Sequence, residues 1–332
     1  MLSSKSILVT GGTGSFGRAF VNRLVRDSTP ARVAIFSRDE QKQFEMQQDS
    51  FLKDSPVLRY FIGDVRDERR LEMAMRGVDY VIHAAALKQV PAAEYNPFEC
   101  IHTNVLGAEN VVNAAIRTGI KRVIALSTDK AASPLNLYGA SKLAADKIFV
   151  SANSLSGGIT KFSVVRYGNV VGSRGSVIPY FRDLIRQGAP SLPITDSRMT
   201  RFWITLNQGI DFVLSCLERM EGGEIFVPKI PSMRMVDLAR AMAPNLPHHV
   251  IGVRPGEKIH EVMITEDDAR TVKELPDRYI IEPAFPFWTA EGFSHADAKP
   301  VPEGFRYASN TNDHWLSDQE LHAYLRELYP DA

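Results

Sequence analysis

Cysteine is almost absent from this chain of 332 residues, which contains only Cys100 and Cys216. Two thiols cannot form a disulfide framework, so a reducing compartment is the simpler expectation. The chain also lacks an excess of charge, since 39 basic side chains balance 39 acidic ones, and it lacks an apolar run long enough to cross a bilayer. The first ten residues enter a strand-like run and a glycine turn, which is unlike a signal peptide. We therefore expect a cytoplasmic protein that binds neither nucleic acid nor membranes.

Strand-like and helix-like segments alternate through the first half of the chain. Between several apolar runs lie amphipathic stretches, for example one in which Phe20, Val21 and Leu24 share a face. Alternating β and α segments with continuously apolar strands predict a parallel sheet covered by helices on both faces. The expected fold class is α/β, a Rossmann-type doubly wound parallel sheet with a smaller C-terminal lobe. The runs expected as strands cover residues 6–10, 31–37, 58–65, 78–85, 121–127 and 161–170.

The character of the sequence changes near residue 171. Beyond this point the chain is richer in Gly, Pro and Arg, and its elements are shorter. Such a pattern predicts a small lobe of loops and short helices over the carboxyl ends of the strands. We expect a cofactor domain with the catalytic residues over 1–170 and a substrate-binding lobe over 171–332, with some later strands and helices returning to the main domain.

The stretch TGGTGSFG follows the first strand and places Gly11, Gly14 and Gly17 at G-x-x-G-x-x-G spacing. Glycines at these positions allow a tight turn, a close approach of the backbone to a pyrophosphate, and close packing of the next helix. The pattern is weak alone, but here it lies between a strand and an amphipathic helix. It therefore predicts a dinucleotide site.

The tip of the second strand indicates which dinucleotide binds. This strand ends with Ser37 and Arg38, a hydroxyl and a guanidinium that suit a 2′-phosphate, so NADP is favoured. Asp39 and Glu40 follow immediately, and one of them could hold a ribose hydroxyl of NAD instead. At the end of the third strand, Asp64 can accept a hydrogen bond from the adenine amino group.

Tyr138 and Lys142 form a Y-x-x-x-K pattern, which puts a phenol and an ammonium one turn apart on a helix. The pair follows the fifth strand of the predicted dinucleotide fold, where a nicotinamide would lie. The ammonium is expected to lower the pKa of the phenol toward neutrality and make Tyr138 a usable base.

These motifs together resemble the extended short-chain dehydrogenases/reductases that act on nucleotide sugars, over residues 5–265. Within that group FSRDE, FIGDVRD, HAAALKQVP, LSTDKAASPLNLYGASK, RYGNVVGSRGSV and MTRFWIT are similar to the inverting UDP-N-acetylglucosamine 4,6-dehydratases. The resemblance implies a hydro-lyase that uses NADP without consuming it and forms UDP-2-acetamido-2,6-dideoxy-beta-L-arabino-hex-4-ulose. In that family this is the first step toward pseudaminic acid for glycosylation of flagellin or surface glycans.

The resemblance also implies a role for each catalytic side chain. Tyr138, assisted by Thr128, takes the 4-hydroxyl proton while hydride leaves C4. Lys130 then removes the C5 proton as Asp129 protonates the departing 6-hydroxyl, and hydride returns to C6. Lys130 needs a depressed pKa for this role, and the opposite assignment of acid and base stays open. Without the resemblance, adjacent Asp129 and Lys130 at a strand end are more often an exposed ion pair.

We expect the cofactor and the substrate to meet beside these residues. No His, Cys or Asp cluster has metal-ligand spacing, so no metal is predicted. His83, Phe202 and Trp203 are expected in the core. The residues expected at the cofactor are Gly11, Thr13, Gly14, Ser15, Phe16, Gly17, Ser37, Arg38, Lys42, Asp64, Val65, Ala84, Ala85, Ala86, Lys88, Tyr138 and Lys142. Those expected at UDP-N-acetylglucosamine are Lys88, Thr128, Tyr138, Asn169, Arg174, Thr195, Met199, Arg201, Arg254 and Glu257.

Two kinds of alternative function remain at this stage. On the same scaffold, the chain could be a 4-epimerase or a retaining 4,6-dehydratase. From a different class, it could be a protein that senses NADP without turnover. Apolar positions in the helices expected near 97–117 and 138–155 suggest a homo-oligomer, a dimer through helix pairs, and the resemblance implies a hexamer.

Overall fold

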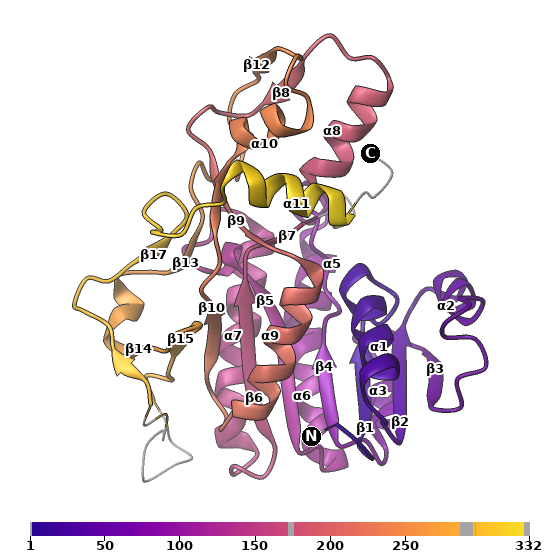
Figure 1. Cartoon of the computed structure of the whole chain (residues 1–332). Coiled ribbons are helices and arrows are strands. Elements are labelled where there is room, and N and C mark those ends of the chain that lie inside the picture. Colours follow the sequence, from indigo (N-terminus) through magenta and orange to yellow (C-terminus); the bar gives the residue numbers. More distant parts are fainter. Residues whose placement is uncertain (1, 172–175, 286–294, 296, 329–332) are drawn as a thin grey trace.

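The computed structural model describes residues 2–171, 176–285, 295 and 297–328 (Figure 1). The main sheet has 10 strands in the order β16-β14-β15-β10-β6-β5-β4-β1-β2-β3. From β3 to β10 all neighbouring strands run parallel, with the order typical of dinucleotide-binding sheets. These strands are β1 (Ser6–Thr10), β2 (Arg32–Ser37), β3 (Leu58–Ile62), β4 (Tyr80–His83), β5 (Arg122–Thr128), β6 (Lys161–Tyr167) and β10 (Ile225–Pro228).

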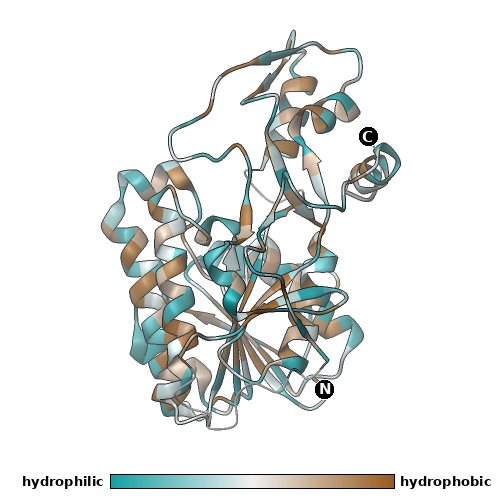
Figure 2. Cartoon of the chain, turned by 90° about the vertical axis from the view of Figure 1, so that its left-hand side faces the viewer, coloured by the Kyte–Doolittle hydropathy of each residue, from teal (hydrophilic) through white to brown (hydrophobic). Residues whose placement is uncertain are grey.

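Helices cover both faces of the parallel strands, with their hydrophobic sides toward the sheet (Figure 2). On one face α1 contacts α9, and on the other α6 lies between α3 and α7. Phe20, Val21 and Leu24 of α1 are buried, as their spacing predicts. No helix in the described ranges is both long enough and apolar enough to cross a membrane. The helices are α1 (Ser15–Asp27), α2 (Glu40–Gln47), α3 (Glu68–Met75), α4 (Val90–Tyr95), α5 (Pro97–Ile101), α6 (Gly107–Thr118), α7 (Leu137–Leu155) and α9 (Leu206–Arg219).

The smaller lobe lies at the top of Figure 1 and has a hydrophobic core of its own. Phe181, Leu192 and Leu238 are among the side chains that fill it. Two short sheets, β11-β9-β7 and β12-β8, frame this core, and β13 pairs with β17 at its base. The elements are β7 (Asn169–Val170), α8 (Val177–Arg186), β8 (Leu192–Ile194), β9 (Thr200–Ile204), β11 (Ser232–Arg234), α10 (Met235–Met242), β12 (His248–Val250), β13 (Val262–Ile264), β17 (Tyr307–Ala308) and α11 (Asp318–Leu328).

Segments beyond residue 171 return to the main domain. Helix α9 contacts α1, β5 and β6, and β10 pairs with β6. The antiparallel strands β15 (Arg278–Ile281), β14 (Val272–Glu274) and β16 (Lys299–Pro300) then extend the sheet, with the 3-10 turn Asp267–Thr271 before β14. These segments cover apolar sheet surface that the first 170 residues would leave exposed.

The helix expected near 97–117 is interrupted. After α5 the backbone forms a π-helical turn, His102–Leu106, and α6 follows it. Val111 and Val112, which suggested an apolar interface, are buried within the chain itself. These side chains therefore give no support to a dimer interface on α6, and oligomerisation stays a prediction.

Candidate active site

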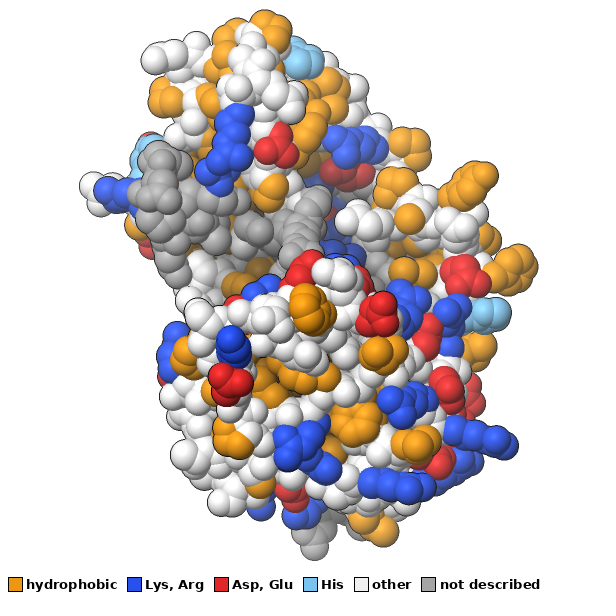
Figure 3. All heavy atoms as spheres, turned by 90° about the vertical axis from the view of Figure 1, so that its right-hand side faces the viewer, with side chains coloured by type: hydrophobic (Ala, Val, Ile, Leu, Met, Phe, Trp, Pro, Cys, Tyr) orange, Lys and Arg blue, Asp and Glu red, His pale blue; other side chains and the backbone are white. Residues whose placement is uncertain are grey.

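A cavity of about 1320 Å³ lies where the carboxyl ends of the parallel strands meet the lobe. The space-filling view shows the surface hollowed between the smaller upper part and the larger lower part (Figure 3). This volume exceeds the range typical of a pocket for one small ligand, so it leaves room for two ligands side by side. The glycine turn after β1, the tips of β2 to β6, the start of α7 and the loop before β13 form its walls.

The turn after β1 leads directly into α1. Gly11 has φ +64°, a conformation that favours glycine, and a Cβ at Gly17 would lie 2.5 Å from the carbonyl oxygen of Gly11. Helix α1 begins at Ser15 without a side-chain cap on its free amide groups. An uncapped helix start that lines a cavity can bind an anion. This end of the cavity therefore fits the pyrophosphate of a dinucleotide.

Polar side chains meet at the tip of β2. Ser37 Oγ lies 2.7 Å from Thr13 Oγ1. The carboxylate of Asp39 caps α2 by accepting from the backbone N–H of Lys42, and it also pairs with the Lys42 ammonium. Glu40 is not among the residues that line the cavity. Asp39 lines the cavity as well, but its carboxylate is engaged by the start of α2 and by Lys42.

Asp64, at the end of β3, makes contacts that the sequence does not predict. Its Oδ2 accepts from Arg66 Nε at 2.9 Å and from Arg66 Nη2 at 2.7 Å, and it lies 3.5 Å from Arg38 Nη1. Burial alone would raise the pKa of Asp64, but the hydrogen bonds from Arg66 and the charges of both guanidinium groups outweigh burial and lower the pKa. The carboxylate is held ionised at the cavity wall, and its contact with adenine stays a prediction.

Asn136 fixes the start of α7, the helix that carries Tyr138 and Lys142. Its Oδ1 accepts from the backbone N–H of Gly139 at 2.8 Å, which is an N-cap contact. Its Nδ2 donates to the carbonyl oxygen of Gly256 in the lobe, also at 2.8 Å. One side chain therefore both begins the catalytic helix and ties it to the lobe.

The charge that acts to lower the pKa of Tyr138 in the structure comes from Lys130, whereas the motif pointed to Lys142. Lys142 Nζ donates to the carbonyl oxygen of Leu126 at 2.7 Å, and burial lowers the pKa of Lys142. Burial also raises the pKa of Tyr138 to about 12, against the charge of Lys130 and a hydrogen bond with Thr128, which both act to lower it. The protein alone therefore does not lower the pKa of Tyr138 toward neutrality, because burial outweighs the charge of Lys130.

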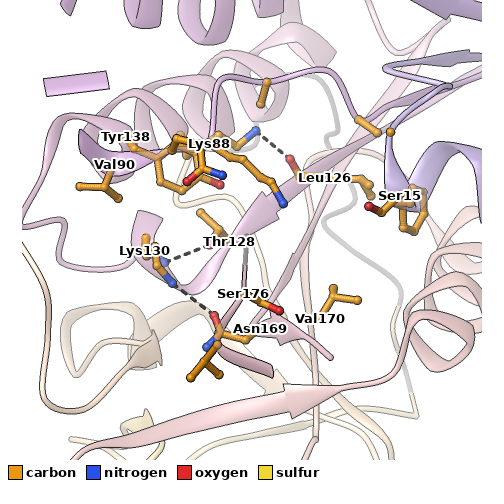
Figure 4. A pocket seen from close by; sticks show the side chains of 18 of the residues that line it. Ser15, Lys88, Val90, Leu126, Thr128, Lys130, Tyr138, Asn169, Val170 and Ser176 are labelled. Carbon is orange, nitrogen blue, oxygen red and sulfur yellow. Dashed lines mark hydrogen bonds between the residues drawn. The ribbon is translucent and has the colours of Figure 1, made fainter. Parts of the chain in front are cut away.

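Asp129 and Lys130 form a buried pair at the end of β5, in the 3-10 turn Asp129–Ala131. Lys130 Nζ lies 3.0 Å from Asp129 Oδ1, and Thr128 Oγ1 donates to the same oxygen at 2.8 Å. Lys130 Nζ also lies 3.4 Å from Asn169 Oδ1 (Figure 4). The Asp129 side chain is only 1% exposed, and Oδ2 has no hydrogen-bond partner among the described residues. The exposed ion pair typical of such neighbours is therefore not what forms here.

The charge on Lys130 depends on two carboxylates. Burial acts to lower the pKa of Lys130, but the charges of Asp129 and Glu261 outweigh burial and raise the pKa above its ordinary value. The expected role of Lys130 as a base requires a depressed pKa. The protein's own groups act in the opposite direction, so Lys130 is cationic at neutral pH unless its proton is passed on.

Arg201 and Arg254 line the cavity in different ways. Arg201 Nη1 donates to the carbonyl oxygens of Thr200 and Ile259, and Nη2 donates to Glu257 Oε1 at 3.2 Å. Its side chain is 7% exposed, so most of its donors serve the lobe itself. Arg254 is exposed at the cavity wall and is the better placed of the two for a diphosphate.

The cavity brings together most of the residues predicted for the site. Asp129 lies behind the wall formed by Lys130, and Arg174 lies outside the described residues. Within the described ranges, no group of three or more His, Cys, Asp and Glu residues could hold a metal ion. The predicted residues that line the cavity are Gly11, Thr13, Gly14, Ser15, Phe16, Gly17, Ser37, Arg38, Lys42, Asp64, Val65, Ala84, Ala85, Ala86, Lys88, Thr128, Lys130, Tyr138, Lys142, Asn169, Thr195, Met199, Arg201, Arg254 and Glu257.

Three residues expected in the core are buried there. His83 Nδ1 lies 2.8 Å from Thr10 Oγ1, and burial, with a smaller effect of the Lys142 charge, lowers the pKa of His83 to about 3. His83 is therefore neutral. Phe202 is fully buried, and Trp203 belongs to the core of the lobe with one edge at the cavity.

The polar residues at the cavity that sequence reasoning missed include Asn136, Lys258 and Glu261. Asn136 carried a usable signal, because Asn is a preferred N-cap and it directly precedes the predicted helix. Lys258 Nζ donates to the carbonyl oxygen of Ala132 at 2.6 Å. Lys258 and Glu261 lie in the same loop as Arg254 and Glu257, which were expected at the substrate, but nothing in the local sequence shows that they too face the cavity.

Comparison with known proteins agrees with this geometry. Residues 7–283 match the model of a family described as polysaccharide biosynthesis protein. The chain is 55% identical over 327 residues to the UDP-N-acetylglucosamine 4,6-dehydratase (inverting) of Campylobacter jejuni subsp. jejuni serotype O:2, with 97% of each chain covered. The chain belongs to this inverting dehydratase family. The chain is also 44% identical to the UDP-glucose 4-epimerase of Rickettsia akari, over 85% of this chain and 84% of that protein.

Two solved structures share the fold of this chain. The X-ray structure of Pen from Bacillus thuringiensis has a TM-score of 0.89 and 37% identity, and the match covers 99% of this chain and 98% of that one. The dTDP-glucose 4,6-dehydratase DesIV from Streptomyces venezuelae has a TM-score of 0.68 over 76% of this chain and 86% of that one. At 23% identity, DesIV supports the fold alone.

Proposed function

We propose that this chain dehydrates UDP-N-acetylglucosamine across C4 and C6 with inversion at C5, using NADP as cofactor. The product is UDP-2-acetamido-2,6-dideoxy-beta-L-arabino-hex-4-ulose. The observation that carries the proposal is the Asp129–Lys130 pair beside Tyr138, with 3.0 Å between carboxylate and ammonium. The chain that holds this pair belongs to the dehydratase family. An epimerase only moves hydride out and back at C4, whereas dehydration also needs an acid and a base. The pair supplies both groups.

Tyr138 first loses its own phenolic proton to solvent, and its phenolate oxygen, oriented by a hydrogen bond with Thr128, then takes the proton of the 4-hydroxyl. The neighbouring Lys130 charge stabilises the phenolate that proton loss from Tyr138 requires. The glycine turn after β1 and the start of α1 would hold the dinucleotide, and its nicotinamide would supply a hydride acceptor for C4 and a hydride donor for C6. The 4-ketone formed on the sugar makes the C5 proton acidic.

Lys130 and Asp129 then remove water, and their contact explains how Lys130 becomes a base. Transfer of one proton from Lys130 Nζ to the Asp129 carboxylate leaves a neutral amine and a carboxylic acid. The amine takes the C5 proton, and the acid gives its proton to the 6-hydroxyl as the C6–O bond breaks. Both side chains end in the charged state from which they began.

The phenol of Tyr138, which holds the proton taken from O4, gives this proton to C5 from the opposite face and so inverts that centre. Over the whole reaction two protons pass to the protein, from O4 and from C5, and two return, to O6 and to C5. The protein therefore regains its starting protonation, and the net chemistry is loss of water.

NADP is supported over NAD by the tip of β2. Arg38 is 53% exposed at the cavity and offers a guanidinium beside Ser37, which suits a 2′-phosphate. Asp39, the residue that could have held a ribose hydroxyl instead, has its carboxylate engaged by Lys42 and the start of α2.

NMR of the reaction in deuterated water tests the proposal. The protein is incubated with NADP and UDP-N-acetylglucosamine, and the sugar spectrum is followed. We expect a new 6-methyl signal, deuterium at C5 and the coupling constants of the inverted centre. An unchanged sugar would indicate an NADP-binding sensor, and a sugar inverted only at C4 would indicate an epimerase such as the Rickettsia relative is named to be. A 6-methyl product with its original C5 configuration would indicate a retaining dehydratase.

The same product suggests a place for the enzyme in metabolism. Within this proposal, the ketone at C4 prepares the sugar for amine transfer on the way to pseudaminic acid, used to glycosylate flagellin or surface glycans. The enzyme would then work in the cytoplasm as a homo-oligomer.

A further inference from the structure

Glu261 approaches Lys130 from the lobe, just before β13. Its Oε1 lies 3.5 Å from Lys130 Nζ and 3.6 Å from Arg201 Nε. The carboxylate is 2% exposed and lines the cavity, and Oε2 has no hydrogen-bond partner among the described residues. A carboxylate so deeply buried is stable only when cations flank it, and Lys130 and Arg201 do so here.

The backbone of Glu261 is held firmly. Its N–H donates to Ser309 Oγ at 2.9 Å, and its carbonyl oxygen accepts from the Ser309 N–H at 2.8 Å. Ser309 Oγ in turn lies 2.7 Å from Thr200 Oγ1 on β9. Glu261 thus presents a fixed negative charge to a lysine whose side chain is 27% exposed and has many rotamers.

We propose that Glu261 is a positioning residue that acts through Lys130. From the lobe, its carboxylate holds the Lys130 ammonium near Asp129 and Asn169 and stabilises the charged form of the amine, so it governs the exchange of a proton between Lys130 and Asp129. This inference rests on the proposed function of the Asp129–Lys130 pair. It also gives a reason for the buried carboxylate in the lobe, because its charge is paired with that of Lys130.

Several groups share the surroundings of Lys130 and must be considered with Glu261. Two carboxylates raise the pKa of Lys130, while burial and the Arg201 charge act to lower it. Loss of Glu261 would therefore shift the balance toward the neutral amine. The charged or titratable groups around Lys130 are Asp129 in its own turn, Tyr138 on α7, Arg201 on β9, and Lys258 and Glu261 in the loop before β13.

Chemical labelling of Lys130 tests this inference without any turnover. The full chain is treated with an amine acetylating reagent at pH 9, and acetylation of Lys130 is followed by peptide mass spectrometry. Because only the neutral amine reacts, we expect roughly tenfold faster labelling in Glu261→Gln than in the wild type. Glu261→Asp should lie between them. Equal rates in wild type and Glu261→Gln would overturn the inference.

A second buried acid provides the matched control. Glu224 is fully buried and binds Ser163 and His295, outside the cavity. Glu224→Gln should lower the melting temperature yet leave both Lys130 labelling and the pH profile of kcat unchanged. If Glu261 were merely structural, Glu261→Gln would behave in the same way, and the inference would be wrong.

The pH profile of turnover adds a catalytic readout. The pair must keep its shared proton to act as both base and acid, so kcat falls at high pH as this proton is lost to solvent, and Glu261→Gln should move this basic limb to lower pH by roughly one unit. Its maximal kcat should fall because the amine is held less firmly. A wild type that forms no 6-methyl product would sink the proposed function, while the labelling rates would still decide the link between Glu261 and Lys130.

Discussion

Lys130 is contacted by side chains from three parts of the molecule: Asp129 in its own turn, Asn169 on β7 and Glu261 before β13. This arrangement holds the ammonium at the cavity wall through side chains. The chemistry proposed for the site therefore depends on one side chain, and its removal should separate binding from dehydration.

The Lys130→Ala variant should bind NADP and UDP-N-acetylglucosamine. It should remove water from the sugar about 10²-fold to 10⁴-fold more slowly, because no amine reaches C5. The measurement is the rate of 6-methyl formation, with the NADP-induced shift in melting temperature as the check on binding. Lys147→Ala, at an exposed lysine of α7, is the matched control and should change neither value. Undiminished turnover by Lys130→Ala would show that another group is the base.

The second residue-scale prediction concerns Arg38. Arg38→Ala removes the guanidinium expected at the 2′-phosphate, so the Kd for NADP should rise roughly tenfold to a hundredfold while the Kd for NAD stays nearly constant. Calorimetric titration with each dinucleotide measures both. Arg66→Ala removes a neighbouring guanidinium that binds Asp64 but does not line the cavity. An equal loss in both variants would contradict the role given to Arg38.

At the scale of elements, the site depends on how closely α7 lies against the turn that follows β5. Gly139 is at the contact point, because a Cβ there would lie 2.3 Å from the carbonyl oxygen of Lys130. The glycine of YGASK thus has a steric role besides the roles of Tyr138 and Lys142. It lets the phenol of Tyr138 and the ammonium of Lys130 share one cavity wall.

Gly139→Ala should lower kcat at least tenfold, because either α7 or the turn must shift by several tenths of an ångström or more. Helix propensity alone would favour alanine, so a gain in stability with full activity would contradict the steric argument. Ala140→Gly makes the reverse exchange at the exposed neighbouring position, and it should cost about 1 kcal/mol of stability without altering kcat.

Elements were easier to predict than contacts. The run expected at 121–127 is β5, Arg122–Thr128, because a buried parallel strand is apolar on both faces and is marked by its composition. The prediction of one continuous helix near 97–117 was wrong, since nothing in the local sequence indicates the π-helical turn at His102–Leu106. The pKa of Tyr138 was likewise expected to fall, and burial, which spacing cannot reveal, raises it.

At the scale of the whole molecule, the site exists only because the lobe closes over the sheet. Asn136 bonds Gly256 across this boundary, and Glu261 approaches Lys130 from the same side. Residues of the first domain were predictable, because motifs such as the glycine turn and Y-x-x-x-K have fixed spacing. Glu261 was not, because it lies 131 positions after Lys130 in the chain and meets it only in the folded protein.

The most direct test of the account is a crystal structure of Tyr138→Phe with NADP and UDP-N-acetylglucosamine bound. The missing phenol should stop turnover and keep the sugar intact. We expect Lys130 Nζ within about 4 Å of C5, and Asp129 within hydrogen-bond reach of the 6-hydroxyl. A hexose bound with both side chains turned away from C5 and C6 would contradict the central claim that this pair removes water.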